Sequence, residues 1–300
     1  MSPAALELAI GPLLFNWSPR RIIDFYAKIA ADPAIQRIYL GEVVCGKREP
    51  LLREALAESA EALAAADKTV VWSTLALPAL PRDRVIIGAL GRDPSLVEIN
   101  DISALAHRLP GSPFVAGPLL NIYNEAAAAE LQALGCVRLC PNIEMSLPAV
   151  AALSARSPDL EIELFSYGRL PLALSGRCYH ARHHGLHKDN CQFVCDRDPD
   201  GLAVRTLDGV GFLAINGVQT LSYGVQAPNA LFAELLNAGV TALRLSPHSG
   251  DMTPIIAAFS QYARGDLTPT DLKAALRAAS PPGPLVDGYL RGAPGARAPK

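Results

Sequence analysis

The sequence predicts an α/β fold of the (β/α)8, TIM-barrel-like class, in which eight parallel strands alternate with helices and close on themselves. Short apolar segments alternate with helical segments along most of the chain, and there are eight such apolar segments. One connection, before the last strand, is much longer than the others and carries cysteines. A doubly wound open sheet has the same local rhythm, but the count of eight favours the barrel.

Each expected strand is a short apolar run bounded by polar or turn-forming residues. The eight candidates are Leu6–Ile10, Ile38–Leu40, Val70–Thr74, Leu96–Ile99, Phe114–Ala116, Val137–Leu139, Ile162–Phe165 and Ala242–Leu245. Gly11 and Pro12 follow the first candidate directly and predict its end.

Four helices are predicted from spacing and from their first residues. Pro19–Ala31 carries apolar residues at helical spacing. Pro50–Ala66 is rich in Ala, Leu and Glu and opens with proline, which suits the first turn of a helix. Asn124–Leu134 and Asn229–Ala238 each begin with asparagine, a residue typical of the N-cap.

The long connection contains about 75 residues between the seventh and eighth strands. This exceeds an ordinary connection in an α/β fold. It includes GRCYHARHHGLHKDNCQFVC and the apolar FLAINGVQTLS, which reads as an extra strand or a hairpin. We expect one barrel-like domain over residues 1–280, with a cysteine-containing insert at about 175–225. Residues 281–300, rich in Pro, Gly and Ala, read as a flexible, poorly ordered tail.

Charge and hydropathy narrow the possible classes of protein. The formal charge is −2 and the sequence pI is about 6.3, which gives no electrostatic reason to expect nucleic-acid binding. No apolar run reaches the roughly 20 residues of a membrane helix. The first residues lack the basic region of a signal peptide. We therefore expect a cytoplasmic protein without a membrane span.

Cysteines are the chemically most informative residues. A cytosolic chain keeps its thiols reduced, so the six cysteines point first to metal binding or catalysis. Cys45 follows the second predicted strand, whereas Cys178, Cys191 and Cys195 follow the seventh. In a barrel all loops that follow the strands emerge at the same face, so the four thiols can converge.

Four thiolates suit either a structural zinc ion or an iron–sulfur cluster. Zinc sites are usually built from two tight pairs, but here one pair, Cys191-x3-Cys195, joins two distant single cysteines. This scattered pattern favours a cluster in a loop-walled pocket, with zinc and the absence of a metal as open alternatives. Cys136 and Cys140 lie in the strand-like CVRLC and read as small buried hydrophobic residues. Cys140 also ends a strand near the same rim.

Four of the six histidines fall within eight residues, and we interpret them as part of a solvated polar loop. They are His180, His183, His184 and His187. Mixed cysteine and histidine ligation, as in Rieske sites, is the alternative. The sequence contains no G-x-S-x-G, H-E-x-x-H, P-loop or G-x-G-x-x-G motif, so hydrolysis and nicotinamide chemistry are not indicated.

Polar residues near the ends of predicted strands are candidates to line a substrate pocket. They are Glu42, Asn121, Asn124, Glu144, Tyr167 and Arg244. The guanidinium of Arg244 could hold a substrate carboxylate through two hydrogen bonds. Lys47 and Arg48, directly after Cys45, could offset the negative charge of a thiolate-bound cluster.

Several segments carry a family resemblance. They are YLGEVVCGKR near residue 40, STLAL at 73–77, PFVAG at 113–117, FSYGRLPLALSGRCY at 165–179 and RLSP at 244–247. Together they resemble the collagenase-like peptidase family, the U-type peptidases of unclassified mechanism. The resemblance covers roughly residues 5 to 265, with its anchors in order.

The resemblance implies a protein that does not act as a peptidase. It implies a [4Fe–4S] cluster on Cys45, Cys178, Cys191 and Cys195, and a heterodimer with a sister subunit of the same family. It also implies oxygen-independent (anaerobic) hydroxylation of an aromatic ubiquinone precursor by an organic hydroxyl donor, with prephenate as the candidate. A zinc- or cluster-stabilised scaffold for a partner and an RNA hydroxylation factor are the competing interpretations.

Overall fold

Eight parallel strands close into a barrel in the part of the chain that the computed structural model describes, residues 5–298. The barrel strands are β1 (Glu7–Ile10), β2 (Arg37–Leu40), β3 (Thr69–Ser73), β4 (Val97–Ile99), β5 (Phe114–Ala116), β6 (Cys136–Leu139), β7 (Glu161–Leu174) and β11 (Val240–Leu245). They pair in chain order, and β11 closes the barrel by pairing with both β7 and β1. The predicted barrel and its eight strands are therefore confirmed.

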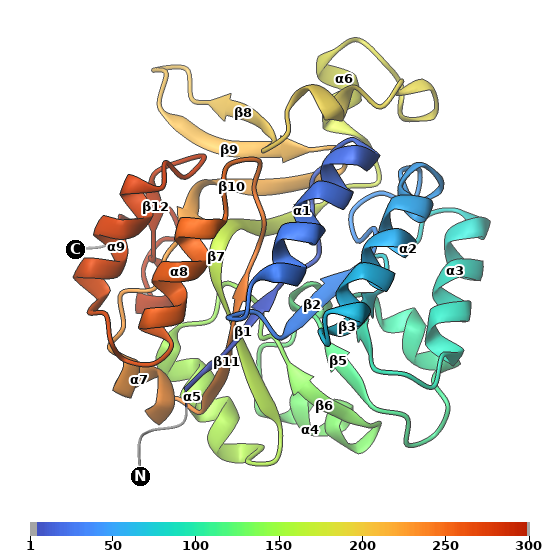
Figure 1. The fold of residues 1–300 in the computed structure, drawn as a ribbon. Coiled ribbons are helices and arrows are strands. Elements are labelled where there is room, and N and C mark those ends of the chain that lie inside the picture. Colours follow the sequence, from blue (N-terminus) through green and yellow to red (C-terminus); the bar gives the residue numbers. More distant parts are fainter. Residues whose placement is uncertain (1–4, 299–300) are drawn as a thin grey trace.

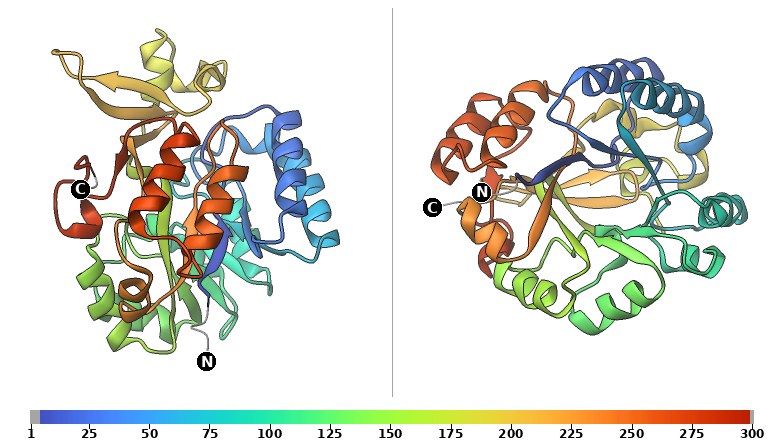
Figure 2. Two further views of the ribbon diagram at one scale, coloured as in Figure 1. Left: turned by 60° about the vertical axis from the view of Figure 1, so that its left-hand side comes forward. Right: turned by 60° about the horizontal axis from the view of Figure 1, so that its bottom comes forward.

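Helices form a ring outside the barrel, as the end-on view in Figure 2 shows. They are α1 (Pro19–Ala31), α2 (Glu49–Ala65), α3 (Pro81–Arg92), α4 (Glu125–Ala133), α5 (Leu147–Arg156), α7 (Phe232–Asn237), α8 (Thr253–Tyr262) and α9 (Pro269–Ala278). Short 3-10 turns lie at Ile102–His107, Pro118–Leu120, Lys188–Asn190, Val194–Arg197 and Tyr289–Arg291. No helix among the described residues is both long and apolar enough to cross a membrane.

Several helices begin after a Ser, Thr or Asn residue whose side chain accepts a hydrogen bond from the first turn. The predicted N-cap Asn124 is confirmed, since its side-chain oxygen accepts a hydrogen bond from the backbone N–H of Ala127 at 2.9 Å. The predicted start at Asn229 is wrong, because α7 begins at Phe232. There the carboxylate of Glu234 accepts from the N–H of Leu231 at 2.5 Å, so the cap is supplied from inside the helix.

Strand β7 is far longer than predicted and connects the barrel to a second sheet. Its first half pairs with β11 as far as Tyr167, and its second half pairs antiparallel with β10 from Gly168 onward. Gly168 has a φ of +122° and lies where a Cβ atom would come within 2.6 Å of the Ser246 side chain. Only glycine fits this crossing point, which directs the rest of β7 beyond the barrel end.

The second sheet has the order β7-β10-β9-β8 with antiparallel pairing, and the short β12 pairs parallel with β10. Its further members are β8 (Leu202–Arg205), β9 (Gly211–Asn216), β10 (Gln219–Gln226) and β12 (Leu285–Val286). The segment FLAINGVQTLS forms the β9–β10 hairpin, as predicted. Figure 1 shows this sheet and α6 (Tyr179–His183) across the end of the barrel where β7 leaves it.

Part of the chain after residue 280 is packed into this second sheet. The composition predicted poor order there, yet Leu285 and Val286 pair with β10 and are buried. Asp287 is also buried and pairs with Arg291 at 2.5 Å. The prediction is wrong for this part because two apolar residues between the prolines and glycines pair with Val225 and Gln226, the end of β10 that β9 does not cover.

The barrel interior contains a group of buried charged residues next to a small apolar cluster. Ala9, Tyr39, Val71 and Val115 form the apolar cluster. The buried Arg244 on β11 pairs with Glu163 on β7 at 3.0 Å and with Glu98 on β4. Its guanidinium also lies 4.0 Å from the centre of the Tyr39 ring. Pairing and hydrogen bonding offset the desolvation of these charges.

Candidate metal centre

Four cysteines from two distant segments line one small cavity at the end of the barrel where β7 leaves it. They are Cys45, Cys178, Cys191 and Cys195. The first lies in the turn after β2, and the other three lie in the insert after β7. The structure thus brings together the four thiols that the topology argument selected, and none of them forms a disulfide.

The loop after β2 is fixed by its own carboxylate. Glu42 is buried, and its Oε1 accepts hydrogen bonds from the backbone N–H groups of Val44 at 2.7 Å and Cys45 at 2.8 Å. These two bonds hold the chain in a tight turn that presents Cys45 to the cavity. Of the predicted pocket residues, Glu42 is the one that lies beside the cysteines.

The insert presents its three cysteines through short local structures. Cys178 is the N-cap of α6, where its Sγ accepts a hydrogen bond from the N–H of Ala181 at 3.4 Å. Cys191 ends a 3-10 turn, and Gln192 and Phe193 then adopt left-handed backbone angles, with φ of 48° and 52°. Such angles cost non-glycine residues about 1–3 kcal/mol each, and this turn returns the chain so that Cys195 reaches the same cavity.

Hydrogen-bond donors and a buried cation surround the thiols. Asn16 Nδ2 lies 3.6 Å from Cys195 Sγ. Arg48 is 1% exposed, and its Nη1 and Nη2 donate to the Leu14 carbonyl at 3.0 Å and to Asn216 Oδ1 at 2.8 Å. Its Nε lacks a hydrogen-bond partner. A buried donor without a partner beside four sulfurs indicates that the cavity suits an anionic group.

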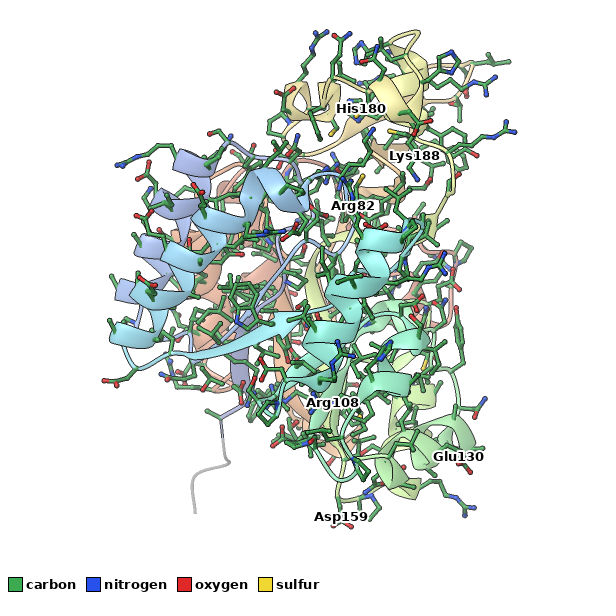
Figure 3. All side chains as sticks on the ribbon, turned by 90° about the vertical axis from the view of Figure 1, so that its right-hand side faces the viewer. Arg82, Arg108, Glu130, Asp159, His180 and Lys188 are labelled. Carbon is green, nitrogen blue, oxygen red and sulfur yellow. The ribbon has the colours of Figure 1, made fainter. Side chains whose placement is uncertain are left out.

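A lysine connects the two cysteine-bearing segments. Lys47 Nζ donates to the carbonyl oxygens of Lys188 at 2.6 Å and Asp189 at 2.9 Å, just before Cys191. Lys47, the positive charge predicted beside Cys45, therefore holds the insert in place. Figure 3 shows His180 and Lys188 of the insert at one end of the molecule with Arg82 near them, and Arg108, Glu130 and Asp159 toward the other end.

Burial disfavours free thiolates in this cavity. Desolvation is the largest effect on the pKa of Cys45 and raises it above its ordinary value, although Arg48 counteracts this. Desolvation likewise raises the pKa of Cys178. The thiolate form therefore requires a compensating positive charge, which a metal ion or cluster would supply.

The spacing of the cysteine sulfurs can be compared with the spacing of ligands around one zinc ion. Among the described residues, His180, His184 and Asp198 form a group of three metal-binding side chains whose ligand atoms all lie within 4.8 Å of one another. No three of the cavity cysteines meet this criterion. Zinc bonds of about 2.3 Å in a tetrahedral site would bring four sulfurs to within about 3.8 Å of one another. The cavity cysteines are therefore spaced more widely than the ligands of one tetrahedral zinc ion.

The other predicted pocket residues do not join the cysteines. Arg244 is occupied by Glu163 and Glu98, so it is not free to hold a substrate carboxylate. Tyr167 is buried, and its hydroxyl lacks a hydrogen-bond partner. Asn124 caps α4. Arg244 and Asn124 thus have partners in the fold that account for their polarity without a substrate, whereas the Tyr167 hydroxyl has none.

Asn121 and Glu144 both contact Asn142, and neither lines the cysteine cavity. Asn121 has a left-handed φ of 59°, and its Oδ1 accepts from Asn142 Nδ2 at 2.8 Å. Glu144 accepts from the Tyr123 hydroxyl at 3.2 Å. Cys140 lies outside the cavity too, in an apolar cluster with Phe165, and its burial raises its pKa to about 12.

The sequence did not predict two asparagines of the site, Asn16 beside Cys195 and Asn216, which accepts a hydrogen bond from Arg48. Asn16 and Asn216 gave no local signal, because each is brought to the site by contacts across most of the chain. The prediction of a solvated loop is wrong for His180, which is fully buried and whose Nε2 lies 2.9 Å from Asp198 Oδ2. His183 and His187 are exposed, as predicted.

The fold and the site together define a (β/α)8 barrel protein with a cysteine-lined candidate metal centre. The chain belongs to peptidase family U32, whose sequence model matches residues 26–296. It is also 31% identical over 86 residues to tRNA hydroxylation protein P of Escherichia coli strain K12. That match covers 29% of this chain and 18% of the relative's length.

Proposed function

We propose that the chain is a UbiV-like, iron–sulfur subunit of an oxygen-independent ring hydroxylation system in ubiquinone biosynthesis, and that it works beside a UbiU-like sister subunit. The observation that carries this proposal is the convergence of four cysteines from two distant segments on one cavity. The family resemblance and the hydroxylation named for the Escherichia coli relative support the same type of chemistry.

The cysteine-lined cavity has the chemistry that an iron–sulfur cluster requires. Four thiolates would hold the irons, and the N–H of Ala181 and the amide of Asn16 already point at two of the sulfurs. Arg48 supplies a buried positive charge that attracts the thiolates of Cys45 and Cys195. Such hydrogen bonds and burial set the potential at which a cluster exchanges single electrons.

Ring hydroxylation without dioxygen needs an oxygen donor and an electron path, and neither comes from side chains alone. A cluster held by Cys45, Cys178, Cys191 and Cys195 would supply the electron path, and an organic hydroxyl donor, for which prephenate is the candidate, would supply the oxygen. This chain contributes the ligands, the donors around them and the closed barrel beneath. Peptidase activity is not part of the proposal.

The direct test is anaerobic purification followed by iron and sulfide analysis, absorption and EPR spectra. We expect about four irons and four sulfides per chain. The Cys191→Ala variant should lose the cluster signal, whereas Cys136→Ala, which changes a buried cysteine in β6 outside the cavity, should keep it. Zinc in place of iron in the wild-type chain would refute the cluster.

The heterodimer is tested separately. A tagged chain expressed together with a UbiU-like protein should retain it through affinity and size-exclusion steps under anaerobic conditions. A strain that lacks the gene for this chain should stop making ubiquinone without oxygen but continue with oxygen. Unchanged anaerobic ubiquinone would contradict the pathway assignment and leave the cluster assignment standing.

A second candidate function is RNA hydroxylation, which the name of the Escherichia coli relative favours. The net charge of −2 makes this chain a poor electrostatic match for RNA. Mass spectrometry of tRNA nucleosides from the same deletion strain separates the two candidates. Loss of a hydroxylated nucleoside with normal ubiquinone would favour the RNA function.

A further inference from the structure

A second cluster of metal-binding side chains lies beside the four cysteines. His180 belongs to α6, His184 directly follows that helix, and Asp198 follows the 3-10 turn that contains Cys195. Each residue has one ligand atom, and these atoms lie within 4.8 Å of one another. The histidine rings stack with their centres 5.8 Å apart.

The two histidines have more nitrogen atoms than protein partners. His180 is 0% exposed, and its Nε2 lies 2.9 Å from Asp198 Oδ2. Its Nδ1 and the Nε2 of His184 are both buried without a hydrogen-bond partner. A buried polar atom without a partner costs roughly 1–3 kcal/mol. A purely structural bridge between His180 and Asp198 would explain the Nε2 contact, but it would leave His180 Nδ1 and His184 Nε2 without partners.

We propose that His180, His184 and Asp198 bind one divalent transition-metal ion, separate from the cysteine site. Two imidazoles and one carboxylate form a ligand set that suits zinc and iron(II), and three protein ligands leave positions open for water or another ligand. The proposal does not depend on the cluster or on its place in ubiquinone synthesis.

Charge and position link the two sites. His180 follows Cys178 by two residues and also lines the cysteine cavity. The positive charge of Arg48 acts on His180 and opposes a second cation. Thiolates in the cavity offset that charge, so the ion should bind more tightly when the cysteine site is loaded.

The test uses the full chain with all four cavity cysteines changed to serine, so that thiolates cannot bind the probe. Zn²⁺ titration by calorimetry should give one equivalent per chain. Adding His184→Ala should weaken this binding by at least about 100-fold, the upper end of what loss of a mere outer-shell partner costs. The matched control His183→Ala changes the exposed neighbouring histidine and should leave affinity within about threefold.

A second measurement covers the case in which the serine variant does not fold, as judged by circular dichroism. The wild-type chain with its cysteine site loaded is incubated with Zn²⁺, desalted and analysed for zinc and iron together. We expect one zinc per chain that His184→Ala loses and His183→Ala keeps, with iron unchanged in both. Equal zinc in both histidine variants, or no zinc in the wild-type chain, would overturn the proposal.

Discussion

Replacing Glu163 by glutamine tests how much the buried charged residues inside the barrel contribute to its stability. Glu163 is fully buried, accepts from Arg244 Nε at 3.0 Å and Nη2 at 3.2 Å, and accepts from the Tyr39 hydroxyl at 2.5 Å. Glutamine keeps the volume but removes the charge, so Arg244 keeps Glu98 as its carboxylate partner. Two hydrogen bonds to charged groups contribute roughly 1.5–3 kcal/mol each.

The expected loss is about 3–5 kcal/mol of unfolding free energy at pH 7, which is the usual cost of breaking a buried ion pair. Urea unfolding followed by circular dichroism measures this directly. The matched control is Glu161→Gln on the same strand. Glu161 pairs with Arg138 at 2.7 Å, but its side chain is 51% exposed, so its loss should cost less than about 1 kcal/mol.

The effect of Glu163→Gln also has a defined pH dependence. Burial alone would raise the pKa of Glu163, but attraction and hydrogen bonds from Arg244 outweigh it and hold the pKa below its ordinary value of 4.5. A lowered carboxyl pKa contributes stability above 4.5, and that stability is lost as pH falls through the native pKa. The two variants should therefore converge in acid. Equal stability of both variants at pH 7 would refute the reasoning.

Three further outcomes follow from the cysteine cavity. Arg48→Met should lower the iron retained per chain, measured after desalting, while Arg48→Lys should retain more because it keeps the charge. In the metal-free chain, alkylation at pH 8 followed by peptide mapping should modify the half-buried Cys191 before Cys140, because burial raises the pKa of Cys140 to about 12. Lys47→Ala should speed iron loss to a chelator, since it removes both contacts to the insert; an unchanged rate would show that the insert does not need them.

The barrel could be predicted from the sequence because its signal is local. Short buried strands alternate with helices that begin at Pro or at capping residues, and glycine and proline mark the boundaries. The length of β7 could not be predicted, since Gly168 and Pro171 inside it read as chain breaks. In the structure Gly168 lies at the crossing between two sheets, and Pro171 lies between two shifts in register, where a missing N–H is tolerated.

Only the part of the site that depends on the order of the barrel strands could be predicted from the sequence. The shared face of a barrel explains why Cys45 meets three cysteines that follow it by more than 130 residues. The role first assigned to Arg244 illustrates the limit. A cation near a strand end looks available for a substrate, but Glu98 and Glu163 on other strands turn toward it once the barrel closes. Such ion pairs form only when the barrel closes, so no pattern among neighbouring residues of the sequence predicts them.

Strand β7 connects the closed barrel to the candidate metal centre. The first half closes the barrel through parallel pairing with β6 and β11 and carries Glu163 inside. The second half leads into the insert, which holds three of the four cavity cysteines in short turns and contacts the loop after β2 through Lys47. Because barrel closure uses none of the four cysteines, loss of the proposed metal should loosen the insert and leave the barrel folded. This outcome would favour the proposed electron-transfer site over a metal that serves only to stabilise the whole chain.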